Sequence, residues 1–307
     1  MRVADSYIIS LENEIIATLR YFNLFKHPLN ADEVYEFLAL KTDRDQLQNI
    51  LRVLVATKRI FEFDGYYMPD DKQEYVSRRI EGAERAQQLM KKALRAAHII
   101  SIFPFVKCVS LSGSLSKGYA NEKSDVDFFI ITKANRLWIC RSLLHVYKKL
   151  TFLWDAQHSY CMNYFIDESM LCLEEQNRFT ATEMATLMPV YNLNVYSDLI
   201  IANERWLAET FPNKKWQTGY PFSELQSRGM KRFFEGIINY LRPKKMNELL
   251  MKLTDDMWRT KWERRGFPMQ EYELAMKTKW YVSKNHPLNY QKKVLTEISK
   301  KQVVPVS

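Results

Sequence analysis

The sequence has few of the features that bridge, anchor or export a protein. Its four cysteines show no C-x-x-C spacing, and its five histidines form no ligand pair at helical spacing, which argues against disulfides and zinc. The start lacks the pattern of a signal peptide, and no run of about 18 apolar residues offers a membrane span. No internal repeat is present. We therefore expect a cytoplasmic protein with reduced cysteines and no membrane contact.

The chain does contain enough apolar material for two or three domains, because 47% of its 307 residues are hydrophobic and 13% are aromatic. Its net charge of +9 is unevenly distributed. From Asn203 onward there are 21 Lys and Arg against 11 Asp and Glu, whereas the preceding residues hold 24 and 25. This basic part is suited to an anionic partner, or it is simply a solvated helical face.

Residues 1–72 are predicted to form a winged-helix-like domain. Apolar stripes indicate helices around Leu11 to Leu19 and Leu47 to Leu54, and Asn30 with Glu33 has the spacing of a capping box between them. Two short β-prone runs then flank Asp64-Gly65, a strong signal for a two-residue hairpin turn. Three helices followed by a wing is the expected order.

The electrostatic case for DNA binding by this domain is weak. Through Asp70 it carries 8 Lys and Arg against 11 Asp and Glu, whereas a surface that follows phosphates is usually basic. A role as scaffold or protein contact is favoured. Four basic residues keep DNA binding open as an alternative: Arg44, Arg52, Lys58 and Arg59.

Residues 73–202 contain the chemical centre of the chain. A helix is predicted from about Glu74 to Ile102, followed by a strand over 106–111, a Gly113-Ser114 turn and a second strand that carries Asp125-Val126-Asp127. Alternation along a strand places both carboxylates on one side, where they repel each other unless a cation lies between them. Mg²⁺ with bound phosphate oxygens suits such a pair.

The turn that precedes the carboxylates has the composition of a phosphate-binding loop. Gly113 allows a phosphate to approach the backbone, Ser114 supplies a hydroxyl donor, and Lys117 adds a positive charge. Gly118 relieves the end of the turn. The alternative interpretation is a surface hairpin with an acidic tip.

The string from Gly113-Ser114 to Asp125-Val126-Asp127 resembles the GS-x10-D-x-D signature of the DNA polymerase beta-like nucleotidyltransferase superfamily. YFNLFKHPLNADEV (21–34) and CMNYFIDE (161–168) also resemble a bacterial group in which a winged-helix-like start precedes such a domain. The resemblance covers roughly two thirds of the chain and implies a mixed-sheet nucleotidyltransferase core. One departure is Asn163, which stands where related polymerases often carry a third carboxylate. Asp167 or Glu168 could substitute for it.

Beyond this core, Thr180 and Glu183 have capping-box spacing, and residues 203–307 are predicted to form a basic helical domain. Trp258, Trp262 and Trp280 stand among basic residues, an arrangement that can stack bases but is more often core and rim. The expected fold class is therefore α+β, with a winged helix, a mixed-sheet core and a C-terminal helical domain.

The resemblance implies an Mg²⁺-dependent nucleotidyltransferase that moves a nucleoside monophosphate from an NTP to an acceptor hydroxyl and releases pyrophosphate. Asp125 and Asp127 would hold the metal, and Gly113, Ser114, Lys117 and Asn163 would contact the nucleotide. The acceptor is expected between the sheet and the C-terminal helices. The alternative is a weak or inactive enzyme that binds nucleotide and contacts DNA or a protein through its winged helix.

Overall fold

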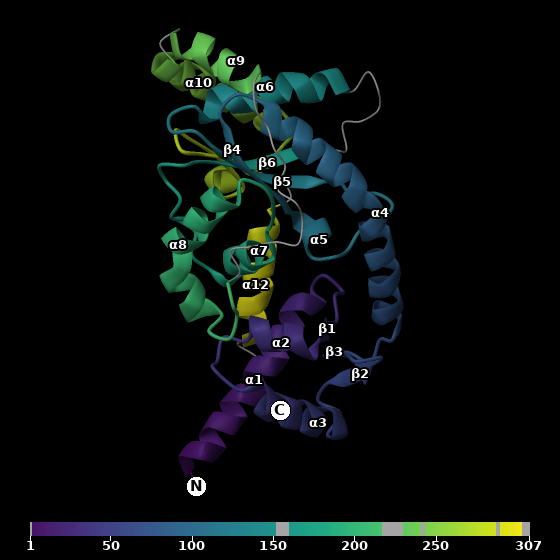
Figure 1. The fold of residues 1–307 in the computed structure, drawn as a ribbon. Coiled ribbons are helices and arrows are strands. Elements are labelled where there is room, and N and C mark those ends of the chain that lie inside the picture. The colour runs from purple at the N-terminus through teal and green to yellow at the C-terminus, as the bar shows by residue number, and fades with distance from the viewer. Residues whose placement is uncertain (1, 152–159, 217–229, 241–242, 287–288, 303–307) are drawn as a thin grey trace.

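A computed structural model describes residues 2–151, 160–216, 230–240, 243–286 and 289–302 (Figure 1). The described chain is α+β and contains two sheets. The longer helices are α1 (Arg2–Asn23), α2 (Ala31–Phe37), α3 (Arg44–Ala56), α4 (Glu74–Ile102), α6 (Leu137–Leu150), α7 (Arg178–Thr186), α8 (Leu193–Thr210), α9 (Met230–Tyr240), α10 (Pro243–Arg264) and α12 (Tyr290–Gln302). Short helical turns are α5 (Gly113–Ser116), η3 (Met269–Glu271) and α11 (Tyr272–Ala275).

The N-terminal residues form three helices and a small antiparallel sheet. Its strands β1 (Leu29–Asn30), β2 (Phe61–Phe63) and β3 (Tyr66–Met68) lie in the order β1-β3-β2. The predicted capping box is confirmed, because Asn30 and Glu33 bond reciprocally through side chain and backbone at the start of α2. Asp64 and Gly65 both have positive φ, which matches the two-residue turn of a tight hairpin. The strand β1 was not predicted.

The larger sheet has six strands in the order β7-β4-β5-β6-β9-β8. Its strands are β4 (Val106–Ser112), β5 (Asp127–Thr132), β6 (Cys161–Asp167), β7 (Met188–Tyr191), β8 (Met276–Lys279) and β9 (Val282–Asn285). The β5–β6 pair is parallel and the other four pairs are antiparallel, so the sheet is mixed. The predicted strand before the Gly-Ser turn is confirmed, and so is the helix over 74–102. The second strand was predicted to carry Asp125, Val126 and Asp127, but β5 begins only at Asp127, so Asp125 lies in the segment before it.

The C-terminal third is not all helical, contrary to the prediction. Besides its helices it supplies the hairpin β8–β9, and β9 pairs with β6 at the centre of the large sheet. Residues after 202 therefore complete the sheet that carries Asp127. Trp280 lies at the turn of this hairpin rather than on a helix, which separates it from Trp258 on α10.

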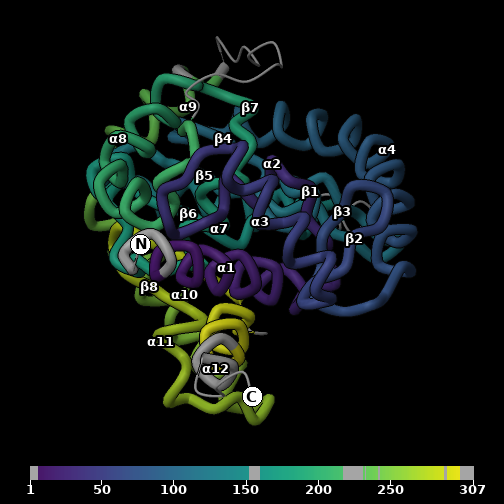
Figure 2. Tube along the Cα trace, turned by 90° about the horizontal axis from the view of Figure 1, so that it is seen from below, coloured from purple at the N-terminus to yellow at the C-terminus, as the bar shows by residue number. Residues whose placement is uncertain are grey.

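Helices cover both faces of the large sheet. Along β5, Phe128 and Ile130 belong to a core shared with α4 and α6, whereas Phe129 and Ile131 belong to a second core. Strand alternation explains this division, because successive side chains point to opposite faces. Figures 1 and 2 show α4 and α8 on opposite flanks of the molecule.

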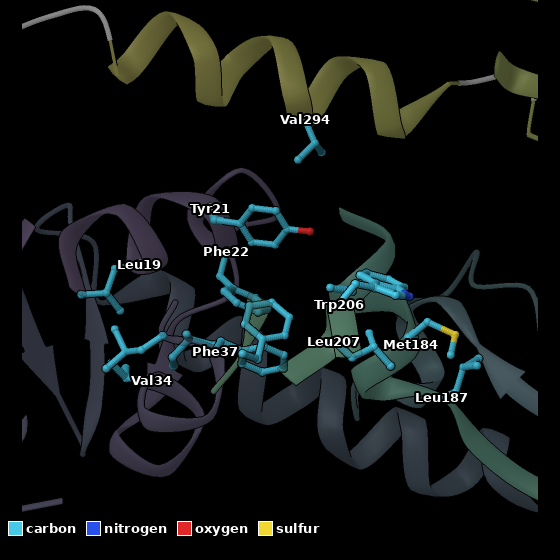
Figure 3. Packing of buried hydrophobic residues seen from close by; sticks show 14 of the residues in the cluster. Leu19, Tyr21, Phe22, Val34, Phe37, Met184, Leu187, Trp206, Leu207 and Val294 are labelled. Atoms are coloured by element: carbon cyan, nitrogen blue, oxygen red, sulfur yellow. The ribbon is translucent and has the colours of Figure 1, made fainter. Parts of the chain in front are cut away.

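The second core joins the N-terminal helices to the rest of the chain. It includes Phe22 and Phe37 from α1 and α2, Leu207 from α8 and Val294 from α12 (Figure 3). Arg178 at the start of α7 reinforces this contact, since its guanidinium pairs with Glu14 at 3.0 Å and donates to the Thr18 hydroxyl at 2.7 Å. The N-terminal helices are thus packed on the sheet-bearing part. Among the described helices, none has the length and apolar character needed to cross a membrane.

Candidate functional site

The Gly-Ser turn joins the end of β4 to the short helical turn α5. Gly113 adopts a φ of +68°, in the left-handed region that glycine enters without steric cost. Its carbonyl accepts hydrogen bonds from the Ser116 hydroxyl at 3.0 Å and from the Lys117 ammonium at 3.0 Å. Gly118 closes the turn with a second positive φ of +67°. The turn therefore has a defined shape before any ligand binds.

Gly113 lies directly against the carboxylate of Asp127. A Cβ atom at position 113 would be 2.4 Å from Asp127 Oδ2, which is far inside van der Waals contact. The approach follows from the pairing of β4 with β5, in which Ser112 is opposite Asp127. Only glycine fits here, because it has no Cβ atom and tolerates the positive φ. The absence of a side chain lets the Gly-Ser turn approach Asp127 closely.

Asp127 lies in an environment that disfavours its charge. Burial raises the pKa of its carboxyl to about 6, and the neighbouring charge of Asp125 raises it further, while the Cys161 thiol and Lys117 act in the opposite direction. Asp125 precedes the strand and is half-buried. A cation between these two carboxylates would remove both the repulsion and much of the cost of burying charge.

Strand β6 presents Asn163 and Cys161 to the same carboxylate. The amide nitrogen of Asn163 donates to Asp127 Oδ1 at 3.3 Å and to Cys161 Sγ at 3.0 Å. The predicted position of Asn163 beside the carboxylates is thus what the structure shows. Cys161 was not predicted as a neighbour, although its spacing of two from Asn163 on a strand was a usable signal.

Lys117 is held by Glu183, which was predicted to close a capping box instead. Its ammonium pairs with Glu183 Oε1 at 2.9 Å. Glu183 does not close a capping box with Thr180, because α7 begins earlier and Asn177 caps it by accepting from the Thr180 amide. The predicted capping box was wrong, and Glu183 instead adds a third carboxylate whose charge raises the pKa of Asp127.

Asp167 and Glu168 do not replace the missing third carboxylate. Asp167 pairs with Thr132 at the far end of β5, about 16 Å along the strand from Asp127 at a rise of about 3.3 Å per residue. Its carboxylate accepts from the Asn135 amide at 2.6 Å and the Ser169 amide at 3.0 Å. Glu168 pairs with Lys107 at 3.3 Å. Both acidic residues therefore stabilise the chain at the end of the sheet that is far from Asp127.

The donor set fits a metal only in part. Within the described ranges, no group of three or more His, Cys, Asp or Glu side chains is arranged to hold a metal ion. Mg²⁺ commonly binds through one or two carboxylates and takes its remaining ligands from water and substrate phosphates. Asp125 and Asp127 fit that incomplete type of site and not an all-protein cage. The Gly113-Ser114 turn adjoins this pair, because Gly113 lies against Asp127.

The chain was compared with models of protein families, with curated proteins and with solved structures, and none of the three comparisons found a match. The function is therefore inferred from the residues of this site.

Proposed function

We propose that the protein is an Mg²⁺-dependent nucleotidyltransferase that transfers a nucleoside monophosphate from an NTP to an acceptor hydroxyl. The observation that carries the proposal is the contact between Gly113 and Asp127, which joins a glycine turn of phosphate-binding type to a carboxylate pair. A glycine turn or a pair of carboxylates alone occurs in proteins of many functions. Placed in contact, they supply a cation site and a phosphate site for the same triphosphate.

Asp125 and Asp127 would hold the metal, which when bound supplies positive charge to the triphosphate and to the leaving pyrophosphate. Ser114 and the amides at the start of α5 would donate to phosphate oxygens, because the first amides of a helical turn have no partner within it. Asn163 holds Asp127 through a hydrogen bond. In the reaction the acceptor oxygen bonds to the α-phosphorus, the bond to pyrophosphate breaks, and the hydroxyl proton leaves to solvent.

Lys117 can contact a phosphate only if it gives up its present partners. Its ammonium is already engaged by Glu183 and by the Gly113 carbonyl, both within 3.0 Å. In this arrangement it supports the backbone of the turn. To contact a phosphate it would have to leave Glu183, so we assign it first to holding the turn in place.

We also propose a winged-helix domain over 1–72, a nucleotidyltransferase core over 73–202 and a basic C-terminal part over 203–307. The order helix, strand, two helices and a hairpin within the first 68 residues supports the first assignment. Two of the four basic residues that favoured DNA are neutralised: Arg44 pairs with Asp32, and Arg59 with Glu12. This pairing supports a protein-contact or scaffold role for the domain.

A second candidate is a nucleotide-binding regulator with little or no turnover. Asn163 favours it, because a neutral amide occupies the place beside Asp127 where a third carboxylate would help hold a second metal. The two candidates share nucleotide binding and differ in the release of pyrophosphate.

The first test is a thermal-shift series with each NTP, with and without Mg²⁺. A ligand at 100 times its dissociation constant stabilises a fold by about 2.7 kcal/mol, which is easily detected. We expect one NTP to stabilise the wild type only with Mg²⁺, and the Asp125→Asn, Asp127→Asn variant to lose that gain. The charge-matched control is Asp71→Asn, Asp256→Asn, at two exposed positions, which should keep it. If no NTP stabilises the wild type at any Mg²⁺ concentration, the proposal is wrong.

A further inference from the structure

A pocket of about 680 Å³ opens beside the Gly-Ser turn, on the side of the N-terminal helices. Three separate segments line it: the turn that follows α1, the start of α4 with Lys72 just before it, and the chain around α5 through Ser114 and Tyr119. Figure 1 shows α4 running from the small sheet to the large one along this side of the molecule. The volume lies within the range of about 300–1,000 Å³ that is usual for small-molecule sites.

The lining of the pocket is predominantly basic. Lys26, Lys72 and Arg78 face it, against a single carboxylate from Glu74. Among the described residues, no carboxylate lies within salt-bridge distance of any of these three cations. Lys117, by contrast, does have such a partner in Glu183. Lys26 and Lys72 are thus available to an anionic ligand, whereas the Arg78 guanidinium is already engaged by backbone carbonyls.

Aromatic rings alternate with these cations. The Arg78 guanidinium lies 4.7 Å from the centre of the Tyr119 ring, and the Lys72 ammonium lies 5.4 Å from that of Tyr75. Phe25 adds a third ring to the lining and is 39% exposed. Rings of this kind can stack on a flat aromatic ligand, and the cations beside them can bind its phosphate.

The wall formed by Tyr119 is built by close packing. Gly82 on α4 receives the ring so closely that a Cβ atom at position 82 would be 2.2 Å from Tyr119 Cδ2. The carbonyl of Gly82 also accepts from the Ala120 amide at 3.0 Å. The Arg78 guanidinium donates to the carbonyls of Phe25 and Lys26, both at 3.0 Å, which fixes the opposite wall. The pocket is therefore held open by three elements at once.

Ser114 is shared between this pocket and the phosphate-type turn. A ligand in the pocket would lie next to a nucleotide bound at Asp125 and Asp127, on the side of α1 and α4. The acceptor was instead predicted to lie between the sheet and the C-terminal helices.

The geometry points to this pocket as the binding site of a nucleoside monophosphate, whose phosphate contacts Lys26 and Lys72 and whose base stacks on the exposed ring of Phe25. That the bound nucleotide is the acceptor of the transfer rests on the proposed function. The binding itself does not depend on it, because no pocket residue other than Ser114 belongs to the metal and triphosphate site.

The test measures binding of AMP, GMP, CMP and UMP to the full chain by calorimetry without Mg²⁺, beside the matching nucleosides and ribose 5-phosphate. We expect at least one monophosphate to bind about 10-fold more tightly than its nucleoside and than ribose 5-phosphate, because charge-assisted and stacking contacts act together. The variant Lys26→Gln, Lys72→Gln should weaken that binding by about 10-fold or more. The control Lys91→Gln, Lys92→Gln removes the same charge from exposed positions farther along α4 and should leave binding unchanged.

The outcomes separate this inference from the proposed function. If Asp125→Asn, Asp127→Asn loses the Mg²⁺-dependent NTP effect but keeps monophosphate binding, both stand. If NTP has no effect while Lys26→Gln, Lys72→Gln still weakens monophosphate binding, the pocket stands and the transferase does not. If the Lys26, Lys72 variant binds as the wild type does, or a nucleoside binds as tightly as its monophosphate, the pocket assignment is overturned.

Discussion

At the scale of single residues, Asp127 is where stability and function oppose each other. Its carboxylate is pressed against Gly113 and lies near the charges of Asp125 and Glu183, so ionisation is costly in the folded chain. The unfolded chain has no such penalty. A cation bound beside Asp127 would reduce this penalty, so under the proposed function the site is least stable when no metal is bound.

This conflict predicts the effect of Asp127→Asn on stability. With a folded pKa of about 6 against an ordinary value of 3.8, the folded state binds more protons between these values, so its stability falls as pH rises through this window. The cost at pH 7 is up to about 3 kcal/mol at 1.36 kcal/mol per pKa unit. We expect the variant to be more stable than the wild type at pH 7 and to lose this advantage by pH 4. Urea unfolding without Mg²⁺ at both pH values measures it.

Asp167→Asn is the contrasting variant. Burial raises the pKa of this carboxyl too, but its oxygens accept from Asn135 and Ser169. Asparagine has one acceptor oxygen instead of two, so the bonds to one of the two oxygens are lost and the protein should be less stable at pH 7, which the same urea unfolding measures. If Asp127→Asn destabilises the protein equally at both pH values, Asp127 has an ordinary structural role.

At the scale of elements, the hairpin β8–β9 is attached through buried charge. The Lys284 ammonium, on β9, lies 2.8 Å from Glu175 and 2.8 Å from the Gln291 amide oxygen, and the lysine is 6% exposed. Lys277 on β8 also pairs with Glu175, at 2.9 Å. The loop before α7 thus supplies the counter-charge for both strands.

We therefore predict that Glu175→Gln destabilises the protein by about 3 kcal/mol, because removing one partner of a buried pair leaves the other charge uncompensated. The neighbouring change Glu174→Gln is the control. Its side chain is 41% exposed and pairs with Lys277 and Lys279, and such surface pairs contribute about 1 kcal/mol or less. Chemical unfolding curves of the two variants give the comparison. Equal losses of unfolding free energy in the two variants would show that the buried Lys284–Glu175 pair stabilises the protein no more than a surface pair does.

The same hairpin shows where the sequence was insufficient for prediction. The β2–β3 hairpin was predicted because Asp64-Gly65 is a local turn signal, confirmed by two positive φ values. Strand β9 carries a buried lysine, and its burial depends on Glu175, more than 100 residues earlier. A local pattern of hydrophobicity does not predict such a strand.

The candidate site divides in the same way. Gly113, Ser114, Asp125 and Asp127 lie within one short stretch, and the resemblance of that stretch to a known signature also pointed to Asn163, which does donate to Asp127. Asp125 lies before β5, so alternation along the strand does not place it. Glu183 reaches Lys117 only through the packing of α7 against the sheet. Its spacing from Thr180 pointed to a cap instead. Residues brought in by tertiary packing were therefore the ones missed.

At the scale of the whole molecule, two distant histidines make the fold sensitive to acid. Burial lowers the pKa of His27 to about 3, assisted by the charges of Arg79, Lys117 and Arg78, and burial lowers that of His286 to about 4. Both remain neutral in the folded chain while the unfolded chain takes up protons below pH 6.5. Stability therefore falls as pH drops through the range from 6.5 to 4.

We predict that His27→Gln reduces this acid sensitivity. The wild-type histidine should cost about 3 kcal/mol between pH 7 and pH 4, and a residue that does not titrate removes that part of the slope. Unfolding free energies measured at both pH values give the slope for each protein. His98→Gln, at an exposed position on α4, is the control and should keep the wild-type slope. An unchanged slope in His27→Gln would show that His27 is not held neutral.

The core that joins α1 and α2 to α7, α8 and α12 has a consequence for synthesis on the ribosome. Phe22 and Val294 belong to one cluster, although more than 270 residues separate them (Figure 3). Translation proceeds from the N-terminus, so the apolar faces of α1 and α2 emerge long before α12 can cover them. The earliest helices to be made are thus among the last to be fully buried, and a nascent chain halted before residue 282 would lack both β9 and this cover.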